Sequence, residues 1–274
     1  MIAKRTRTFA RRTRKSFIRT TPETIKEQEM KKVAVCLICT GKYDVFLEQI
    51  LKSIDDKFLL SHQISIHIFS DKVQDIVIKD FINMLALNRV EIYYHSIESL
   101  KFPLITLYRY RIMLENIRGL AENDYIYYMD VDMRIENEVG DDILGPLVAV
   151  KHPGFSVVGG GAWCTDENSM AYTGPMHRHV YVAGGVQGGE TKNFLEAMRV
   201  MDDNIRIDES RGVMAPWHDE SHWNKYIAYY KGDLRILDSS YCMVENQKQR
   251  DLWKLNHLTP KIVALDKNHS EIRS

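Results

Sequence analysis

The sequence predicts an α/β protein in which helices flank a mostly parallel β-sheet. Short apolar segments rich in Val, Ile and Tyr alternate with segments whose apolar residues recur every three or four positions. The 274 residues are 45% hydrophobic, which is enough for one large core. Regular strand–helix alternation is typical of parallel sheets covered by helices on both faces.

The first half of the chain shows this alternation most clearly. The predicted strands are residues 32–39, 64–71, 89–97 and 124–132. The predicted helices are residues 43–59, 73–87 and 104–121. Because ligands of such sheets bind beyond the carboxyl ends of the strands, we expect the functional residues there.

The second half is richer in glycine and turn-forming residues. Residues 152–177 predict long loops, followed by the stretch "YVAGGVQGGE" at 181–190. Its glycines form either a pair of tight turns or a pocket wall that a bulky ligand approaches closely. A helix at 191–208, a second helix around Glu220, short strands and a polar tail at 265–274 complete the prediction.

Charge is balanced overall but not along the chain. Lys+Arg and Asp+Glu both number 37, so we expect no nucleic-acid partner. The N-terminal segment has eight basic residues before Glu23 and no apolar stretch as long as a signal peptide or membrane anchor requires. A solvated arm, weak contact with an anionic membrane and a transit peptide all fit, and we favour the first two. We expect a cytoplasmic protein, soluble or peripherally bound to a membrane.

Asp130 and Asp132 follow the apolar strand "YIYYM". Residues i and i+2 of an extended chain point to the same side, and two adjacent carboxylates repel unless a cation or proton lies between them. Hard oxygen ligands suit Mn²⁺ or Mg²⁺ bridged to phosphates. The alternative is an exposed strand end that carries two acids.

The segment "WHDESH" at 217–222 places His218 and His222 on one helical face. A zinc site of the H-E-x-x-H type would need Glu directly after the first His, but Asp219 stands there. The competing interpretation is a polar helix start whose acids lie near the positive end of the helix dipole. Arg109, Lys267 and Arg273 could meet phosphates, or could be ordinary surface charges.

Six stretches, in the same order along the chain, resemble glycosyltransferase family 6, which includes the histo-blood-group A and B transferases and the α-1,3-galactosyltransferases. They are "LITLYRYRIM", "YMDVDM", "LVAVKHPGF", "YVAGGVQGG", "APWHDESHWNKY" and "LDKNHSEIR". The resemblance implies a glycosyltransferase-A fold, Rossmann-like, over residues 31–274, after a disordered or helical arm at 1–30. Within it, residues 31–135 would bind the nucleotide, and residues 136–274 the acceptor.

The family implies a retaining enzyme that moves Gal or GalNAc from UDP to a galactoside in α-1,3 linkage. Asp130 and Asp132 would bind Mn²⁺, with Mg²⁺ as the substitute. Glu220 would be catalytic, either as nucleophile or as stabiliser of an oxocarbenium-like transition state. The implied donor-binding residues are Ile38, Thr40, Tyr43, Arg109, Asp130, Val131, Asp132, Ala183, Gly184, Gly185, Asp219, Lys267 and Arg273. The implied acceptor-binding residues are His152, Trp217, Glu220 and Glu245.

Small residues at Ala183 and Gly185, where the family sets donor choice, favour UDP-GalNAc and a blood-group-A-like product on a galactose-terminated acceptor with or without fucose. The alternatives are a UDP-Gal enzyme and a non-catalytic sugar-binding relic. Without the anchor and stem of the animal members, the chain resembles the shorter, soluble microbial or viral type. It keeps both aspartates, which implies metal dependence. Glu245 is the only acid where animal members carry Trp-Asp, so recognition on the reducing side of the acceptor differs.

Overall fold

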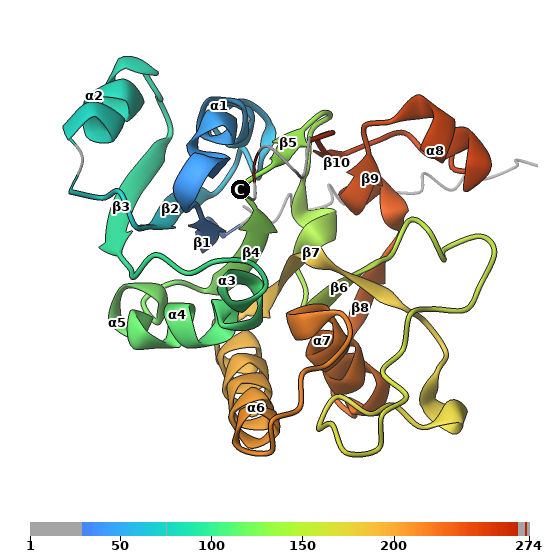
Figure 1. The fold of residues 1–274 in the computed structure, drawn as a ribbon. Helices are drawn as coiled ribbons and strands as arrows, with labels where there is room; N and C mark the ends of the chain where they lie inside the picture. The colour runs from blue at the N-terminus through green and yellow to red at the C-terminus, as the bar shows by residue number, and fades with distance from the viewer. Residues whose placement is uncertain (1–28, 75, 268–271, 273–274) are drawn as a thin grey trace, which may run out of the picture.

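The computed structural model describes residues 29–74, 76–267 and 272. Most of the predicted basic arm and Arg273 therefore lie outside the described residues. A seven-stranded sheet in the order β3-β2-β1-β4-β7-β6-β8 forms the centre of the molecule (Figure 1). Its strands are β1 Lys32–Ile38, β2 Gln63–Ser70, β3 Val90–Ser96, β4 Tyr125–Asp130, β6 Leu147–Lys151, β7 Val182–Glu190 and β8 Arg235–Leu237.

The predicted mostly parallel α/β sheet is confirmed. Strands β3, β2, β1 and β4 run parallel, β7 is antiparallel to both β4 and β6, and β8 is parallel to β6. The four parallel strands come from the half of the chain in which strand–helix alternation is regular. Their carboxyl ends meet at one edge, where β4 ends in Asp130.

Helices cover both faces of the sheet. They are α1 Leu47–Lys57, α2 Ile76–Met84, α3 Leu104–Leu107, α4 Arg109–Glu115, α5 Ile117–Leu120, α6 Thr191–Ser210, α7 His218–Tyr229 and α8 Gln247–Leu252. Alternate residues of β1 enter two different cores: Val35 packs in the core that includes α1, and Cys36 in the core that includes α4, α6 and α7. Figure 1 shows α1 and α6 on opposite sides of the sheet.

A second, three-stranded sheet brings the C-terminal segment beside Asp132. It consists of β5 Met133–Ile135, β10 Ile262–Ala264 and β9 Met243–Val244, in the order β5-β10-β9. Directly after β10, the Leu265 N–H donates to the Asp132 carbonyl at 2.8 Å. This pairing places Asp266 and Lys267 at the carboxyl end of β4.

Two sequence predictions about local structure are wrong, and so is one of the two alternatives for the glycine-rich stretch. The helix expected at 104–121 is three short helices, because Tyr108 and Asn116 leave helical geometry with ψ angles of 11° and 26°. The helix expected at 43–59 begins as a 3-10 turn over Gly41–Phe46. The glycine-rich stretch forms β7, a regular strand, and not two tight turns. A Cβ on Gly188 would lie 2.3 Å from the Tyr127 ring, so glycine there permits close strand packing.

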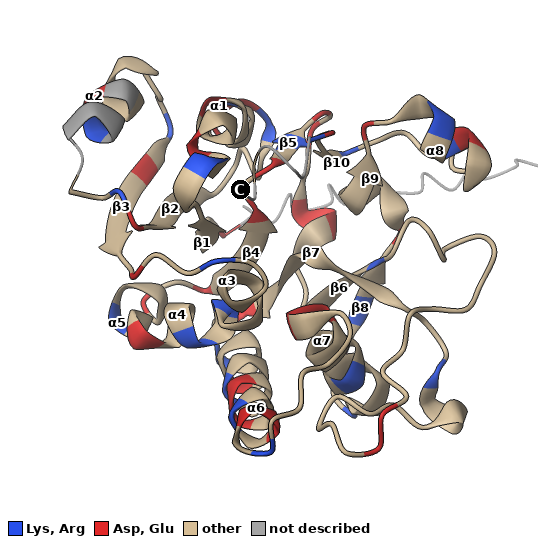
Figure 2. Ribbon diagram, viewed as in Figure 1, with Lys and Arg blue, Asp and Glu red and all other residues tan. Residues whose placement is uncertain are grey.

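No helix within the described ranges is long and apolar enough to cross a membrane. Cys36 and Cys39 are buried free thiols on opposite faces of the sheet, and each packs in one of the two cores. Figure 2 shows acidic residues at the carboxyl end of β4, at the edge where the first half of the sheet and the C-terminal segment meet.

Candidate functional site

Two cavities meet at the carboxylates of Asp130 and Asp132. The first, of about 440 Å³, contains eight of the predicted donor-binding residues in its wall: Ile38, Thr40, Tyr43, Arg109, Asp130, Val131, Asp132 and Lys267. These residues come from the ends of β1 and β4, from the 3-10 turn at Gly41–Phe46, from α4 and from the C-terminal segment. A cavity at the ends of parallel strands is the position that this class of sheet predicts for a ligand.

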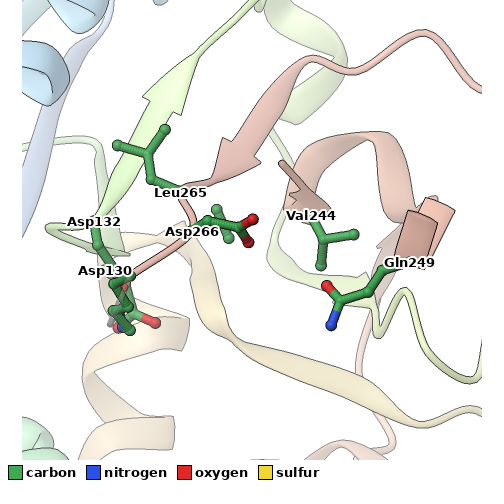
Figure 3. Close-up of a pocket in the computed structure, with 8 residues that line it drawn as sticks. Asp130, Asp132, Val244, Gln249, Leu265 and Asp266 are labelled. Atoms are coloured by element: carbon green, nitrogen blue, oxygen red, sulfur yellow. The ribbon is translucent and has the colours of Figure 1, made fainter. Parts of the chain in front are cut away.

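The second cavity, of about 630 Å³, shares Asp130, Asp132 and Lys267 with the first. Its remaining wall comes from β9, α8, the end of β10 and the segment that follows: Val244, Gln249, Ala264, Leu265 and Asp266. Figure 3 shows the two aspartates on one side of this cavity, with Val244 and Gln249 on the other. The aspartate pair therefore faces two spaces, of which only the first was predicted.

Lys267 forms an ion pair with the Asp132 carboxylate and lies 5.1 Å from the centre of the Tyr43 ring. Burial and the neighbouring Asp130 raise the pKa of Asp132, and the Lys267 ammonium group opposes that rise. Burial lowers the pKa of Lys267 less than the carboxylates raise it, so its pKa is above the ordinary value. An ammonium group thus neutralises part of the charge of the aspartate pair.

The aspartate pair fits a hard divalent cation only if other ligands complete the coordination. Among the residues that the structure describes, no group of three or more His, Cys, Asp or Glu side chains could hold a metal ion. Mg²⁺ and Mn²⁺ commonly take one or two carboxylates and complete their shell with waters and phosphates. Two carboxylates beside a cavity of about 440 Å³ would supply the protein's part of such a shell.

The zinc alternative has less support. The His222 side chain is buried, and its Nε2 lies 3.6 Å from the Asp208 carboxylate, which also accepts a hydrogen bond from the Ser169 hydroxyl at 2.6 Å. His218 packs edge-on against Phe102. The two histidines therefore contact different elements, and no third ligand joins them within the described part of the chain.

Arg109 connects the aspartate pair to β7 and α7. Its Nε lies 3.0 Å from Asp219 Oδ2, and its Nη1 lies 3.6 Å from Asp130 Oδ1 and donates to the Gly184 carbonyl at 2.8 Å. The guanidinium group also lies 4.2 Å from the centre of the Tyr128 ring. Burial raises the pKa of Asp219 to about 7, although Arg109 opposes the rise. This buried arginine fixes the relative positions of three elements of the site.

Glu220, in the first turn of α7, is held at both carboxylate oxygens. The Tyr181 hydroxyl donates to Oε1 at 2.8 Å, and the Gly184 N–H donates to Oε2 at 2.8 Å. His152 packs edge-on against the Tyr181 ring with centroids 5.7 Å apart. Trp217 precedes α7 and is 54% exposed, so its ring is available to a ligand. The structure thus joins His152 to Glu220 through Tyr181, which was not among the predicted site residues.

The small residues of β7 do not open into free space. A Cβ on Gly185 would lie 2.4 Å from Met133 Cε and 2.9 Å from Asp130 Oδ2. A Cβ on Gly184 would lie 3.2 Å from the Glu220 Cβ. Ala183 is 3% exposed and belongs to the core. Gly184 and Gly185 are small because the carboxylates of Glu220 and Asp130 pack closely against them.

Glu245 has structural partners. It accepts a hydrogen bond from the Asp266 N–H at 2.9 Å and lies 3.5 Å from an Arg134 guanidinium nitrogen. These contacts tie β9 to the segment that carries Lys267. Its predicted contact with an acceptor stays a prediction.

Two buried residues behind Gly184, Gln187 and Tyr110, were not predicted from the sequence. Gln187 accepts a hydrogen bond from the Tyr110 hydroxyl at 2.9 Å and donates to the Gly184 carbonyl at 2.9 Å. The carbonyl therefore has two donors, Gln187 and Arg109, and its orientation is fixed. A polar residue at a central position of an apolar strand was the available signal, because buried amides require partners.

Comparison with known proteins finds a family model described as glycosyltransferase family 6 that matches residues 20–274. Histo-blood group ABO system transferase 1 of Rattus norvegicus is 27% identical over 246 residues, which cover 88% of this chain and 68% of that protein. Globoside alpha-1,3-N-acetylgalactosaminyltransferase 1 of Gallus gallus is 27% identical, with coverage of 88% and 69%. The O-antigen biosynthesis glycosyltransferase WbnI of Escherichia coli is 26% identical, with coverage of 78% and 88%.

Proposed function

The chain belongs to glycosyltransferase family 6, and we propose that it is a retaining enzyme that transfers GalNAc from UDP-GalNAc to a terminal galactoside in α-1,3 linkage. One relative supports this donor by name, the globoside alpha-1,3-N-acetylgalactosaminyltransferase, and another is named as a histo-blood group ABO system transferase. The acceptor would be a galactose-terminated oligosaccharide, with or without fucose, and the product a blood-group-A-like glycan.

The proposal rests on the positions of Asp130 and Glu220, whose carboxylates contact two adjacent residues of β7. Gly185 packs against Asp130, and Gly184 binds Glu220 through its N–H. A sugar joined to a diphosphate at Asp130 and Asp132 would therefore have its reacting carbon close to Glu220. A sugar transferase requires this adjacency of a leaving-group site and a carboxylate at the reacting carbon.

The 440 Å³ cavity would bind the nucleotide. Tyr43 offers an aromatic face to the uracil, and Ile38 and Thr40 line the same cavity. Lys267 would move from Asp132 to the diphosphate, which carries a higher negative charge. A divalent cation held by Asp130 and Asp132 would supply further positive charge for the departing diphosphate.

Arg109 and Glu220 would act on the sugar itself. Arg109 is buried and fixed by Asp219, so it presents a charge that does not have to reorganise during the reaction. Glu220, with both oxygens fixed, would serve either as nucleophile or as stabiliser of positive charge at the anomeric carbon. Both roles require an ionised, oriented carboxylate.

Trp217, His152 and Glu220 would bind the acceptor galactose. Tryptophan rings pack against sugar faces, and the exposed Trp217 offers such a face. Glu245 accepts a hydrogen bond from Asp266, which lines the second cavity, and the reducing side of the acceptor would extend in that direction. In this arrangement residues 31–135 bind the nucleotide and residues 136–274 supply most of the acceptor site.

A second candidate is transfer of Gal from UDP-Gal, because the family includes α-1,3-galactosyltransferases. Product analysis distinguishes transfer of GalNAc from transfer of Gal. The chain would be incubated with Mn²⁺, a fucosylated galactoside and UDP-GalNAc or UDP-Gal, and the products examined by mass spectrometry and NMR. The proposal predicts a product larger by one N-acetylhexosamine, with the anomeric coupling of an α-linkage to O3 of galactose. A β-linked product would contradict retention, and an exclusively galactosylated one would contradict the donor assignment.

A further inference from the structure

Tyr181 connects the catalytic carboxylate to the loop that follows β6. It directly precedes β7, and its hydroxyl donates to Glu220 Oε1 at 2.8 Å. The other carboxylate oxygen, Oε2, accepts the Gly184 N–H at 2.8 Å, three residues further along the same segment. One short segment therefore supplies both donors to the carboxylate.

The Tyr181 ring is held by three aromatic neighbours from residues 152–163. Trp163, Phe155 and His152 all pack edge-on against it, with ring centroids 5.1, 5.2 and 5.7 Å away. Edge-to-face packing fixes ring orientation and adds stability beyond buried area. The ring, and with it the hydroxyl, is thus oriented by a loop that is remote in sequence from Glu220.

Gly161 lets that loop approach the ring. A Cβ at this position would lie 2.6 Å from Tyr181 Cδ2, 2.7 Å from Tyr181 Cβ and 2.6 Å from Trp163 Nε1. Real Cβ atoms do not approach so closely, so any larger residue would push the loop or the ring away. Gly161 is therefore the position at which a small change would disturb Tyr181 without touching Glu220.

We propose that Tyr181 is a positioning residue that orients the Glu220 carboxylate for reaction, and that residues 152–163 set this orientation by packing against its ring. The inference rests on the proposed function, because it assigns a purpose to the Glu220 carboxylate. It adds to that function a residue and a loop contact that control the catalytic step.

The chemistry of the pair supports this assignment. Burial and the adjacent Glu220 raise the pKa of Tyr181, so its hydroxyl stays protonated and can only donate to the carboxylate. With the hydroxyl removed, Glu220 Oε1 loses its protein donor and the carboxylate can rotate about the remaining bond to Gly184. Hydrogen bonds to charged groups are strong enough for such a loss to matter.

The test compares Tyr181→Phe with Tyr93→Phe in the full chain. The control also removes a Tyr hydroxyl that donates to a glutamate, because Tyr93 donates to Glu91 at 2.9 Å on the exposed side of β3. We expect Tyr181→Phe to lower kcat about 10- to 100-fold while the KM for donor and acceptor changes less than about threefold. Tyr93→Phe should leave both parameters unchanged.

Gly161→Ala tests the loop contact, with Gly140→Ala as the control because its new Cβ would meet only Asp142 Oδ1, at 3.6 Å. We expect Gly161→Ala to reproduce the fall in kcat and to change it little further when combined with Tyr181→Phe. Full additivity would overturn the loop's role.

If the wild-type chain turns over but kcat is unchanged in Tyr181→Phe, or only the acceptor KM rises, the positioning role is overturned. The proposed function is upheld in that case. No turnover by the wild-type chain would instead refute the proposed function, and this inference with it. If Tyr181→Phe folds poorly, the Tm of each variant identifies the loss, and Gly161→Ala still decides the inference through kcat.

Discussion

Gly185→Ala tests whether β7 is built from small residues in order to hold the carboxylates in place. The new Cβ would lie 2.4 Å from Met133 Cε and 2.9 Å from Asp130 Oδ2. The Met133 methyl group ends a flexible side chain and can move, but it is buried and has little free space. The Asp130 carboxylate would have to shift as well, and its Oδ1 already accepts a hydrogen bond from the Tyr128 hydroxyl at 2.7 Å.

The size of the effect follows from these contacts. Overpacking of a filled core costs about 1–3 kcal/mol, so the Tm of Gly185→Ala should fall by several degrees. Carboxylate ligands must lie within about 0.2 Å of their ideal metal distance, so a displaced Asp130 should also weaken Mn²⁺-dependent UDP binding by about tenfold or more. Gly140→Ala, whose Cβ makes only an ordinary contact, should change neither quantity.

Thermal denaturation and calorimetric titration of UDP, with and without Mn²⁺, measure both effects. The sequence suggested a different reason for glycine at this position, namely room for the acetamido group of the donor. Unchanged Tm and UDP binding, combined with a shift in preference from UDP-GalNAc to UDP-Gal, would refute the packing explanation. They would support selection of the donor by size.

Three further predictions follow from individual contacts. Arg109→Lys should lower kcat at least tenfold in steady-state assays, because a single ammonium group cannot contact Asp219 and the Gly184 carbonyl in the same fork geometry; wild-type kcat would contradict this. Tyr43→Ala should weaken UDP binding in calorimetry by about 1–3 kcal/mol through the loss of aromatic contact, and unchanged affinity would place the uracil elsewhere. Burial, with a smaller contribution from His95, lowers the pKa of His67 to about 4 from an ordinary 6.5. The unfolded chain therefore takes up the proton first, so the stabilising contribution is complete above about pH 6.5 and is lost as the pH falls toward 4. His67→Gln should flatten the dependence of Tm on pH in this range, and an equally steep dependence in the variant would contradict it.

The sequence was sufficient to predict the framework of the site. Strand alternation located the carboxyl end of β4, and the D-x-D spacing placed Asp130 and Asp132 together there. These predictions succeeded because they depend on local periodicity and on a general property of parallel sheets. Lys267 required the family resemblance, since nothing local connects it to residues 135 positions earlier.

Features that depend on tertiary contacts escaped prediction. The stretch 181–190 carries little side-chain periodicity because four of its residues are glycine, so its regular strand was not recognised. The contact between Tyr181 and Glu220 spans 39 positions, and no sequence pattern pairs the two. The breaks at Tyr108 and Asn116 were likewise invisible in a continuous helical pattern, yet the first of them sets where α4, and so Arg109, begins.

Metal-dependent sugar transfer is tested most directly by measuring UDP release from UDP-GalNAc with Mn²⁺ or EDTA, with and without a fucosylated galactoside. Wild-type chain would be compared with Asp132→Asn and Glu220→Gln, which keep side-chain size while removing charge. The proposed function predicts release that needs the acceptor and is lost with EDTA, with UDP binding weakened only in Asp132→Asn and turnover lost in both variants. Wild-type activity in Glu220→Gln, or a wild-type chain that binds no UDP, would contradict it.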